Sequence, residues 1–178
     1  YENGELLKAA ILPIGADHIT NDIARGLRIT LDAAERIKRM YGTAVSESLP
    51  KRGQEIDLID YGSEQSELVP LRFVAEVIEA RVEEIFEKAE EELKKIDREG
   101  LLPAGVILSG GGAKLPGMID VAKRVLRLPC ALGVTNVASS MPEVVNDSSF
   151  STAVGLVVWA YENERRDEGI AGRVQHLG

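Results

Sequence analysis

The sequence has little of the chemistry that marks a metalloprotein or a disulfide-bonded protein. It contains one cysteine and two histidines in 178 residues. A lone Cys130 cannot form an internal disulfide, and together with His18 and His176 it provides no spaced set of zinc ligands. No carboxylate or nucleophile at motif spacing marks His18 as a catalytic base. We therefore expect a reducing, cytoplasmic setting, with no metal site and no catalytic residue in this chain.

Long hydrophobic runs are also missing. The longest apolar stretch, residues 153–160, falls well short of the roughly 20 residues that cross a bilayer, so we expect a core helix there. The segment that follows Tyr1 has neither the basic flank nor the apolar centre of a secretory signal. We expect no membrane-spanning segment, and a chain start that lies inside a longer protein.

Positive charge is in deficit. The 29 acidic residues outnumber the 21 basic ones and give a formal net charge of −8. Such a balance repels phosphate backbones, so nucleic acid is not an expected partner. The hydrophobic share of 44% is enough for a buried core, and we expect a globular protein.

Apolar periodicity and turn residues divide the chain into strands and helices. The predicted strands are 5–14, a short stretch around 56–59, 104–109 and 129–134. The predicted helices are one that begins at Asp17 or Thr20 and ends or bends at Gly26, then 30–40 with a stop at Gly42, 71–96, 118–126 and 149–162. Residues 137–147 are predicted to be a loop. The strand at 104–109, the glycines after it and the next helix form one α/β unit.

The chain divides into three regions that differ in composition and hydrophobic pattern. Residues 43–102 open with polar turns and contain the longest amphipathic helix, which predicts an inserted subdomain. Residues 1–42 and 103–163 flank this insertion and are predicted to form a discontinuous core subdomain. Residues 164–178 are charged and dotted with glycine, so we expect a flexible linker or tail.

Two stretches are candidates for ligand binding. Gly110, Gly111 and Gly112 follow an apolar strand, and residues without a β-carbon let backbone amides approach a ligand closely. The spacing matches neither a Walker loop nor the dinucleotide fingerprint, and a tight turn without a ligand is an equal alternative. Glu35 lies three residues before Lys38 and four before Arg39, so their side chains share a helix face. Taken alone, such a pair is most simply a surface salt bridge.

Together the two stretches carry a family resemblance. A helix with E-R-x-K-R, followed far downstream by a strand ending in S-G-G-G-A-K-L-P-G, resembles the adenosine-binding half of the actin, Hsp70 and hexokinase superfamily. The stretches L-P-I-G-A-D-H-I-T-N-D-I-A (12–24), A-E-V-I-E-A-R (75–81) and S-T-A-V-G-L (151–156) are similar to the FtsA family of bacterial cell-division proteins. The likeness extends to about Tyr161. Ala16 departs from it, because the family more often has a glycine there.

The resemblance implies an α/β fold, a ribonuclease H-like actin-type ATPase half-domain with an inserted smaller α/β subdomain at 43–102. It implies that the core subdomain binds the adenosine of ATP, with Mg²⁺ in the full-length protein. The implied contacts with the nucleotide are Gly15, Glu35, Lys38, Arg39, Gly110, Gly111, Gly112 and Lys114.

The resemblance also implies that two phosphate-binding hairpins and the catalytic carboxylate lie before Tyr1, where a D-x-G-x-x-x-T-D hairpin is expected. A chain without those groups has nothing to position or neutralise a transferring phosphoryl group. We therefore expect at most a weak ATPase in the full-length protein and no catalysis by this chain alone.

The expected partners follow from the same resemblance. The inserted subdomain would receive the C-terminal tail of FtsZ, a tubulin-like polymer protein, through Arg72, Arg81 and Glu84. The full-length protein would form actin-like filaments at the inner face of the plasma membrane at the division site. Its attachment to the membrane would use a C-terminal helix that this chain does not contain. Two alternatives share the fold: a sugar kinase or Hsp70-like ATPase, and a pilus-assembly relative of FtsA.

Overall fold

The computed structural model describes residues 5–50, 53–134 and 147–174. The helices are α1 (Ala16–Leu27), α2 (Leu31–Tyr41), α3 (Leu71–Lys94), α4 (Met118–Leu126) and α5 (Ser151–Val174). The strands are β1 (Glu55–Asp57), β2 (Leu68–Pro70), β3 (Val106–Leu108) and β4 (Cys130–Leu132). Short 3-10 turns are η1 (Ser46–Ser48), η2 (Leu58–Tyr61), η3 (Gly111–Lys114) and η5 (Ser148–Phe150).

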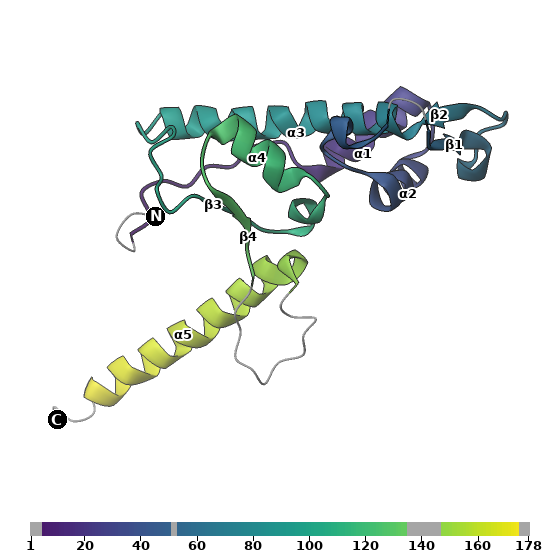
Figure 1. Ribbon diagram of the computed structural model, residues 1–178. Helices are drawn as coiled ribbons and strands as arrows, with labels where there is room; N and C mark the ends of the chain where they lie inside the picture. Colours follow the sequence, from purple (N-terminus) through teal and green to yellow (C-terminus); the bar gives the residue numbers. More distant parts are fainter. Residues whose placement is uncertain (1–4, 51–52, 135–146, 175–178) are drawn as a thin grey trace.

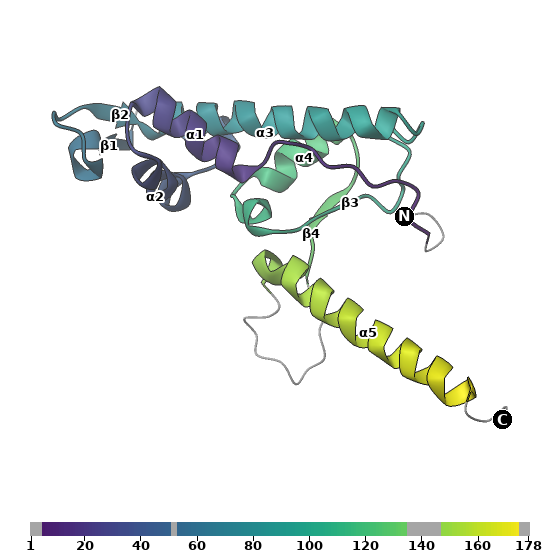
Figure 2. The ribbon, with the colours of Figure 1, turned by 180° about the vertical axis from the view of Figure 1, so that it is seen from behind.

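The long helix α3 runs the length of the main body, and the shorter helices pack along it (Figure 1). Helices α1 and α4 both contact α3, and α2 contacts α1. The view from behind shows the same arrangement, with α5 extending away from the body (Figure 2). No helix in the described ranges is both long and apolar enough to span a bilayer.

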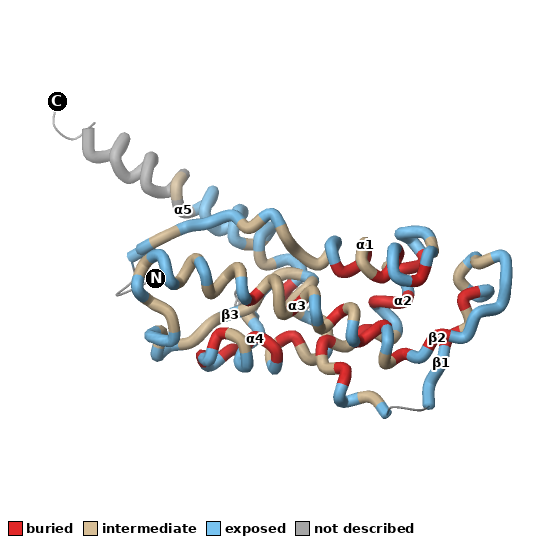
Figure 3. The backbone as a smooth tube through the Cα atoms, turned by 90° about the horizontal axis from the view of Figure 1, so that it is seen from above, coloured by how far each residue is buried: buried red, intermediate tan, exposed pale blue. Residues whose placement is uncertain are grey.

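The hydrophobic core lies between α3 and the shorter helices. Apolar residues at steps of three and four give α3 one buried face, so Val74, Ile78 and Val82 are at most 1% exposed. Ile23 of α1 and Val121 of α4 meet this face and are equally buried. The buried segments of these helices face one another across the core (Figure 3). Burying each such side chain contributes about 1.5–3 kcal/mol.

Local signals set the ends of α1 and α2. The backbone N–H of Gly15, at the start of α1, donates to His18 Nδ1 over 3.2 Å. The hydroxyl of Thr30 accepts from the backbone N–H of Ala33 and caps α2. Gly42 ends α2, and its N–H donates to the carbonyl of Lys38. The predictions of a start at Thr30 and a stop at Gly42 are confirmed.

Two small sheets accompany the helices. Strands β3 and β4 pair in parallel, with Val106 opposite Cys130, and α4 connects them as a βαβ unit. Strands β1 and β2 form an antiparallel pair ahead of α3. Tyr61 of η2 ties this pair to α2, because its hydroxyl lies 3.3 Å from that of Tyr41 and Arg36 stacks 5.2 Å above its ring.

The segment 5–14, predicted as a buried strand, has no strand beyond an isolated bridge residue at Glu5. Leu6 is 58% exposed and Ile11 is 96% exposed. A buried strand needs hydrogen-bonding neighbours and cover on both faces, and among the described residues no strand pairs along this segment. Lys8 of this segment forms an ion pair with Glu92, near the end of α3, at 2.8 Å.

The C-terminal helix also differs from its prediction. The sequence pattern ended it at about Glu162, whereas α5 continues to Val174. Trp159, within the stretch 153–160 where a core helix was expected, is 65% exposed. Leu31 of α2 and Phe73 of α3 are also exposed, at 55% and 42%. Cys130 is buried, and burial raises the pKa of its thiol. The predicted loop at 137–147 lies, except for its last residue, outside the described residues.

Candidate functional site

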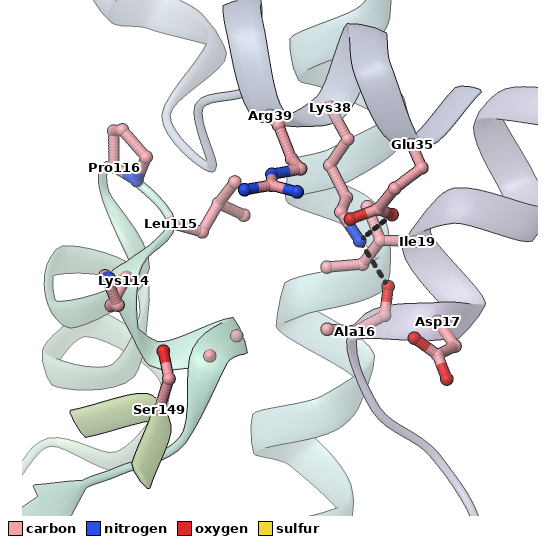
Figure 4. A pocket seen from close by; sticks show the side chains of 12 residues that line it. Ala16, Asp17, Ile19, Glu35, Lys38, Arg39, Lys114, Leu115, Pro116 and Ser149 are labelled. Atoms are coloured by element: carbon pink, nitrogen blue, oxygen red, sulfur yellow. Dashed lines mark hydrogen bonds and ion pairs between the residues drawn. The ribbon is translucent and has the colours of Figure 1, made fainter. Parts of the chain in front are cut away.

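A cavity of about 510 Å³ opens between α2 and the glycine turn that follows β3 (Figure 4). We call it the α2–η3 cavity. Residues from α1, α2, the η3 region and η5 line it: Ala16, Asp17, Ile19, Glu35, Lys38, Arg39, Gly111, Gly112, Lys114, Leu115, Pro116 and Ser149. Its volume falls within the range of small-molecule sites, which is roughly 300–1,000 Å³.

The two candidate stretches from the sequence meet at this cavity. Glu35, Lys38 and Arg39 line one wall, and Gly111, Gly112 and Lys114 line the opposite one (Figure 4). Gly15 and Gly110 are outside the lining and immediately precede lining residues, at the starts of α1 and η3. Six of the eight residues expected to bind the nucleotide therefore share one concave surface.

Lys38 is buried in the wall and is 9% exposed. Its ammonium donates to the Thr20 hydroxyl over 2.7 Å and to the Ala16 carbonyl over 3.2 Å. Its third contact is an ion pair with Glu35 Oε2 at 2.6 Å. An ammonium has three protons, so all of them have acceptors inside the protein. Lys38 thereby fastens the start of α1 to α2.

Glu35 stands beside Lys38 with part of its side chain open to the cavity. Burial raises the pKa of its carboxyl, but hydrogen bonds from Lys38 and Thr20, with the positive charges of Lys38 and Arg39, lower the pKa below its ordinary value overall. The carboxylate is therefore ionised at neutral pH. An ionised carboxylate only accepts hydrogen bonds, so this wall favours a ligand group with N–H or O–H donors.

Two further cations line the cavity. Arg39 extends its guanidinium toward Leu115 (Figure 4), and no acceptor among the described residues takes a hydrogen bond from it. Lys114, on the opposite wall, forms an ion pair with Asp147 at 2.6 Å. The hydrogen bond from Lys114 is the main reason that the pKa of Asp147 falls to about 2. The ion pair joins η3 to the segment before η5.

The glycine turn brings backbone close to the cavity. Gly110 has φ +89° and ψ 171°, a conformation that is open to glycine and strained for other residues. A β-carbon on Gly112 would lie 3.0 Å from the methyl carbon of Ala16. The departure at Ala16 noted in the sequence therefore stands directly against the glycine wall, and its methyl group limits the space there.

A seam joins the end of α2 to the loop after η3. The N–H of Ala44 donates to the Pro116 carbonyl over 2.8 Å, and Ala44 is fully buried. Gly117 has φ +81°, and a β-carbon there would lie 2.7 Å from Val45 Cγ2. Both walls of the cavity are anchored to this seam, because α2 leads into it and Leu115 directly precedes it.

The sequence-based prediction of nucleotide contacts did not include half of the cavity lining: Ala16, Asp17, Ile19, Leu115, Pro116 and Ser149. It also missed Thr20 as the buried contact of Lys38 and Glu35. The position of Ile19 was visible as part of an apolar helix face, and Pro116 was visible within the glycine motif. Nothing in the sequence pattern connects Ser149 with Gly111, although its hydroxyl lies 3.7 Å from the β-carbon position of that glycine.

The residues expected to meet a partner lie on α3, away from the cavity. Arg81 donates to Asp22 of α1 and to Glu84, so the structure brings Arg81 and Glu84 together. Arg72 is roughly two and a half turns earlier on the helix and donates to Glu76 and to the carbonyl of Leu49. Among the described residues no cluster of acidic, histidine or cysteine side chains could hold a metal ion.

Comparison with solved structures defines the class of fold. The chain is similar to MreB 5 of Spiroplasma citri bound to AMPPNP, with a TM-score of 0.67 at 17% identity over 93% of this chain and 49% of that one. The same protein bound to ADP gives a TM-score of 0.65 at 16% identity, over 88% of this chain and 47% of that one. The chain therefore has part of an actin-type α/β fold, as predicted.

Sequence relatives identify the family. The model of the family "Cell division protein FtsA" matches residues 1–155. Cell division protein FtsA of Pseudomonas aeruginosa is 32% identical over 92% of this chain and 39% of its own length. The corresponding protein of Bacillus subtilis is 34% identical over 93% of this chain and 36% of its own length. The chain belongs to the FtsA family, and it spans about two fifths of the length of these relatives.

Proposed function

We propose that this chain forms the adenosine-binding half of an actin-like, ATP-binding cell-division protein. The observation that carries the proposal is the α2–η3 cavity, where Glu35 and Arg39 face Gly111 and Gly112 across one concavity. Membership of the FtsA family favours a role in cell division over the sugar kinase and the chaperone that share the fold. Relatives of this fold, the MreB 5 proteins, were crystallised with AMPPNP and ADP.

The chemistry of the cavity suits a nucleotide. Gly111 and Gly112 line one wall without side chains, so a planar base can approach the backbone there. The ionised Glu35 can accept hydrogen bonds from sugar hydroxyls, and Arg39 is a cation without an acceptor in the described part of the chain. Bound ATP would supply the phosphoryl group and the negative charge. Within this chain, Arg39 and Lys114 are the cavity-lining cations best placed to balance that charge.

Paired arginine variants test this proposal on the complete protein. Arg39 and Arg36 lie on the same helix, but Arg39 lines the cavity while Arg36 stacks on Tyr61. We expect Arg39→Gln to weaken ATP binding about tenfold, because one charged hydrogen bond or stacking contact is lost. Calorimetry measures the change. Arg36→Gln should bind as the wild type does. Equal loss in both variants, or none in Arg39→Gln, would contradict the assignment of the cavity.

We further propose that the full-length protein assembles into actin-like filaments and tethers FtsZ to the inner face of the plasma membrane at the division site. Family membership and the actin-type fold support this role. Sedimentation and electron microscopy with ATP and without nucleotide provide the test of assembly. A protein that stays monomeric with ATP under all protein concentrations tested would contradict filament formation.

The FtsZ tail is proposed to dock on the surface of the inserted subdomain around α3, through Arg72, Arg81 and Glu84. Arg72 gives the cleaner test, because Arg81 already holds α1 through Asp22. Arg72→Gln should weaken binding of an FtsZ tail peptide, measured by fluorescence anisotropy. Lys94→Gln is the matched control, since Lys94 belongs to the same helix and pairs with Glu90 at its other end. Unchanged peptide binding in Arg72→Gln would remove that residue from the interface.

A further inference from the structure

A buried hydroxyl connects the two charged residues of the cavity wall. Thr20 of α1 is 7% exposed, and its Oγ1 lies 2.7 Å from Lys38 Nζ and 2.6 Å from Glu35 Oε2. An ammonium can only donate and an ionised carboxylate can only accept. The hydroxyl must therefore accept from Lys38 and give its single proton to Glu35, so its orientation is fixed by its neighbours.

This arrangement leaves the two carboxylate oxygens of Glu35 in different situations. Oε2 accepts from the Thr20 hydroxyl and is paired with Lys38. Oε1 has no hydrogen-bond donor among the described residues, and the side chain is 42% exposed at the cavity. Oε1 is thus the acceptor that a ligand can reach, and the hydrogen bond at Oε2 sets its direction.

We propose that Thr20 is a positioning residue for the nucleotide: it orients the Glu35 carboxylate so that Oε1 accepts a hydrogen bond from a ribose hydroxyl. This inference rests on the proposed nucleotide-binding function. A carboxylate repels phosphate groups, so the ligand part that meets Glu35 is a neutral hydrogen-bond donor, and the sugar hydroxyls provide one. The phosphates are directed away from this carboxylate.

The pairing of Glu35 with Lys38 does not make Thr20 redundant. The two charged residues are three apart on α2 and contact each other directly at 2.6 Å, so the ion pair survives removal of the hydroxyl. Within the described ranges, what is lost is the one hydrogen bond that Glu35 receives from a neighbouring helix. A flexible Glu35 retains its charge but no longer presents Oε1 in a fixed direction, which reduces its preorganisation for the sugar.

The test compares ADP with 2′,3′-dideoxy-ADP, which lacks both ribose hydroxyls, on the complete protein. Calorimetry gives the two dissociation constants for the wild type, Thr20→Val and Thr20→Ser. We expect the wild type to prefer ADP, Thr20→Val to bind ADP about tenfold more weakly with the preference lost, and Thr20→Ser to keep the preference. Thr30→Ala is the matched control, because it removes the cap of α2, lowers the melting temperature and leaves the preference unchanged.

Each outcome has a defined meaning. Thr20→Val with the wild-type preference, or Thr20→Ser without it, would overturn the role of the hydroxyl. A wild type that binds both nucleotides equally would overturn the ribose contact, while a wild type that binds neither would reject the proposed function itself. If Thr20→Val does not fold, Thr20→Ala replaces it. In a Glu35→Gln background, loss of the Thr20 hydroxyl should change the preference no further.

Discussion

The guanidinium of Arg81 holds the carboxylate of Asp22 in a two-pronged contact between α3 and α1. Nε lies 2.5 Å from Oδ2 and Nη2 lies 3.0 Å from Oδ1. The hydrogen bond with Asp22 is the main cause that raises the pKa of Arg81. Both side chains are about one quarter exposed, and the third nitrogen, Nη1, donates to Glu84. A residue expected to meet a partner protein is therefore also a link within the fold.

We expect Asp22→Asn to lower the free energy of unfolding by about 1–3 kcal/mol, because a two-pronged charged contact in a partly buried setting becomes a neutral one. Urea denaturation measures the change. In a double-mutant cycle, Arg81→Leu should cost less in the Asp22→Asn background than alone. Strictly additive losses would mean that the two residues do not act as a pair. If Asp22→Asn also weakens binding of the FtsZ peptide, Arg81 affects that binding by holding α1 against α3 and not by contacting the peptide.

The contact between Ala16 and Gly112 predicts a pair of compensating substitutions. Gly112→Ala should weaken nucleotide binding about tenfold or more, because the new methyl group would lie 3.0 Å from the Ala16 methyl carbon and push the wall inward. Ala16→Gly alone should leave the site open. The double variant should recover most of the affinity measured by calorimetry, and failure to recover it would show that the methyl contact does not limit the site.

The ion pair of Lys114 with Asp147 predicts a visible titration shift. The pKa of Asp147 is about 2 instead of 3.8, so its contribution to stability is full above about 3.8 and is lost as pH falls through about 2. Carboxyl NMR titration of the wild type should find the low pKa. Lys114→Gln should raise it toward the ordinary value, and added salt should do so partly, since the pair is exposed. If the pKa of Asp147 stays near 2 in Lys114→Gln, the ion pair is not the origin of the low pKa.

Gly42 and Gly15 form a matched pair for testing how tightly the end of α2 packs where the seam begins. A β-carbon on Gly42 would lie 2.2 Å from the Lys38 carbonyl oxygen and 3.1 Å from Leu115, whereas one on Gly15 would meet nothing within 4 Å. We expect Gly42→Ala to lower the melting temperature strongly, equivalent to about 2 kcal/mol or more, as expected for a backbone clash. Gly15→Ala should melt close to the wild type. Comparable melting of the two variants would contradict the account of the seam.

Local signals explain which parts of the fold were predictable. The bounds of α4 at 118 and 126, the start of α2 after Thr30 and its stop at Gly42 follow from capping residues and periodicity, which act within a few residues. The segment 5–14 was wrong as a strand, because its apolar run indicates burial only if other elements cover it. The expectation of a core helix at 153–160 was wrong for the same reason, since Trp159 is 65% exposed.

The candidate site was predictable in its members but not in their roles. The sequence marked Lys38 as a group for contact with a nucleoside, and that contact remains a prediction. Its three acceptors include the Ala16 carbonyl and the Thr20 hydroxyl, which belong to another helix that the local pattern cannot relate to α2. The burial of Lys38 and the bridging position of Thr20 therefore required the packing of α1 on α2.

The buried position of Ala44 beside Pro116 has a consequence for swapping segments between relatives. In a chimera that exchanged residues 43–102 as a self-contained unit, the two partners of the Ala44–Pro116 hydrogen bond would come from different proteins. It would also pair a foreign α3 with the native α1 and α4, whose apolar faces share its core. The smallest graft that keeps these surfaces matched extends from α1 through α4.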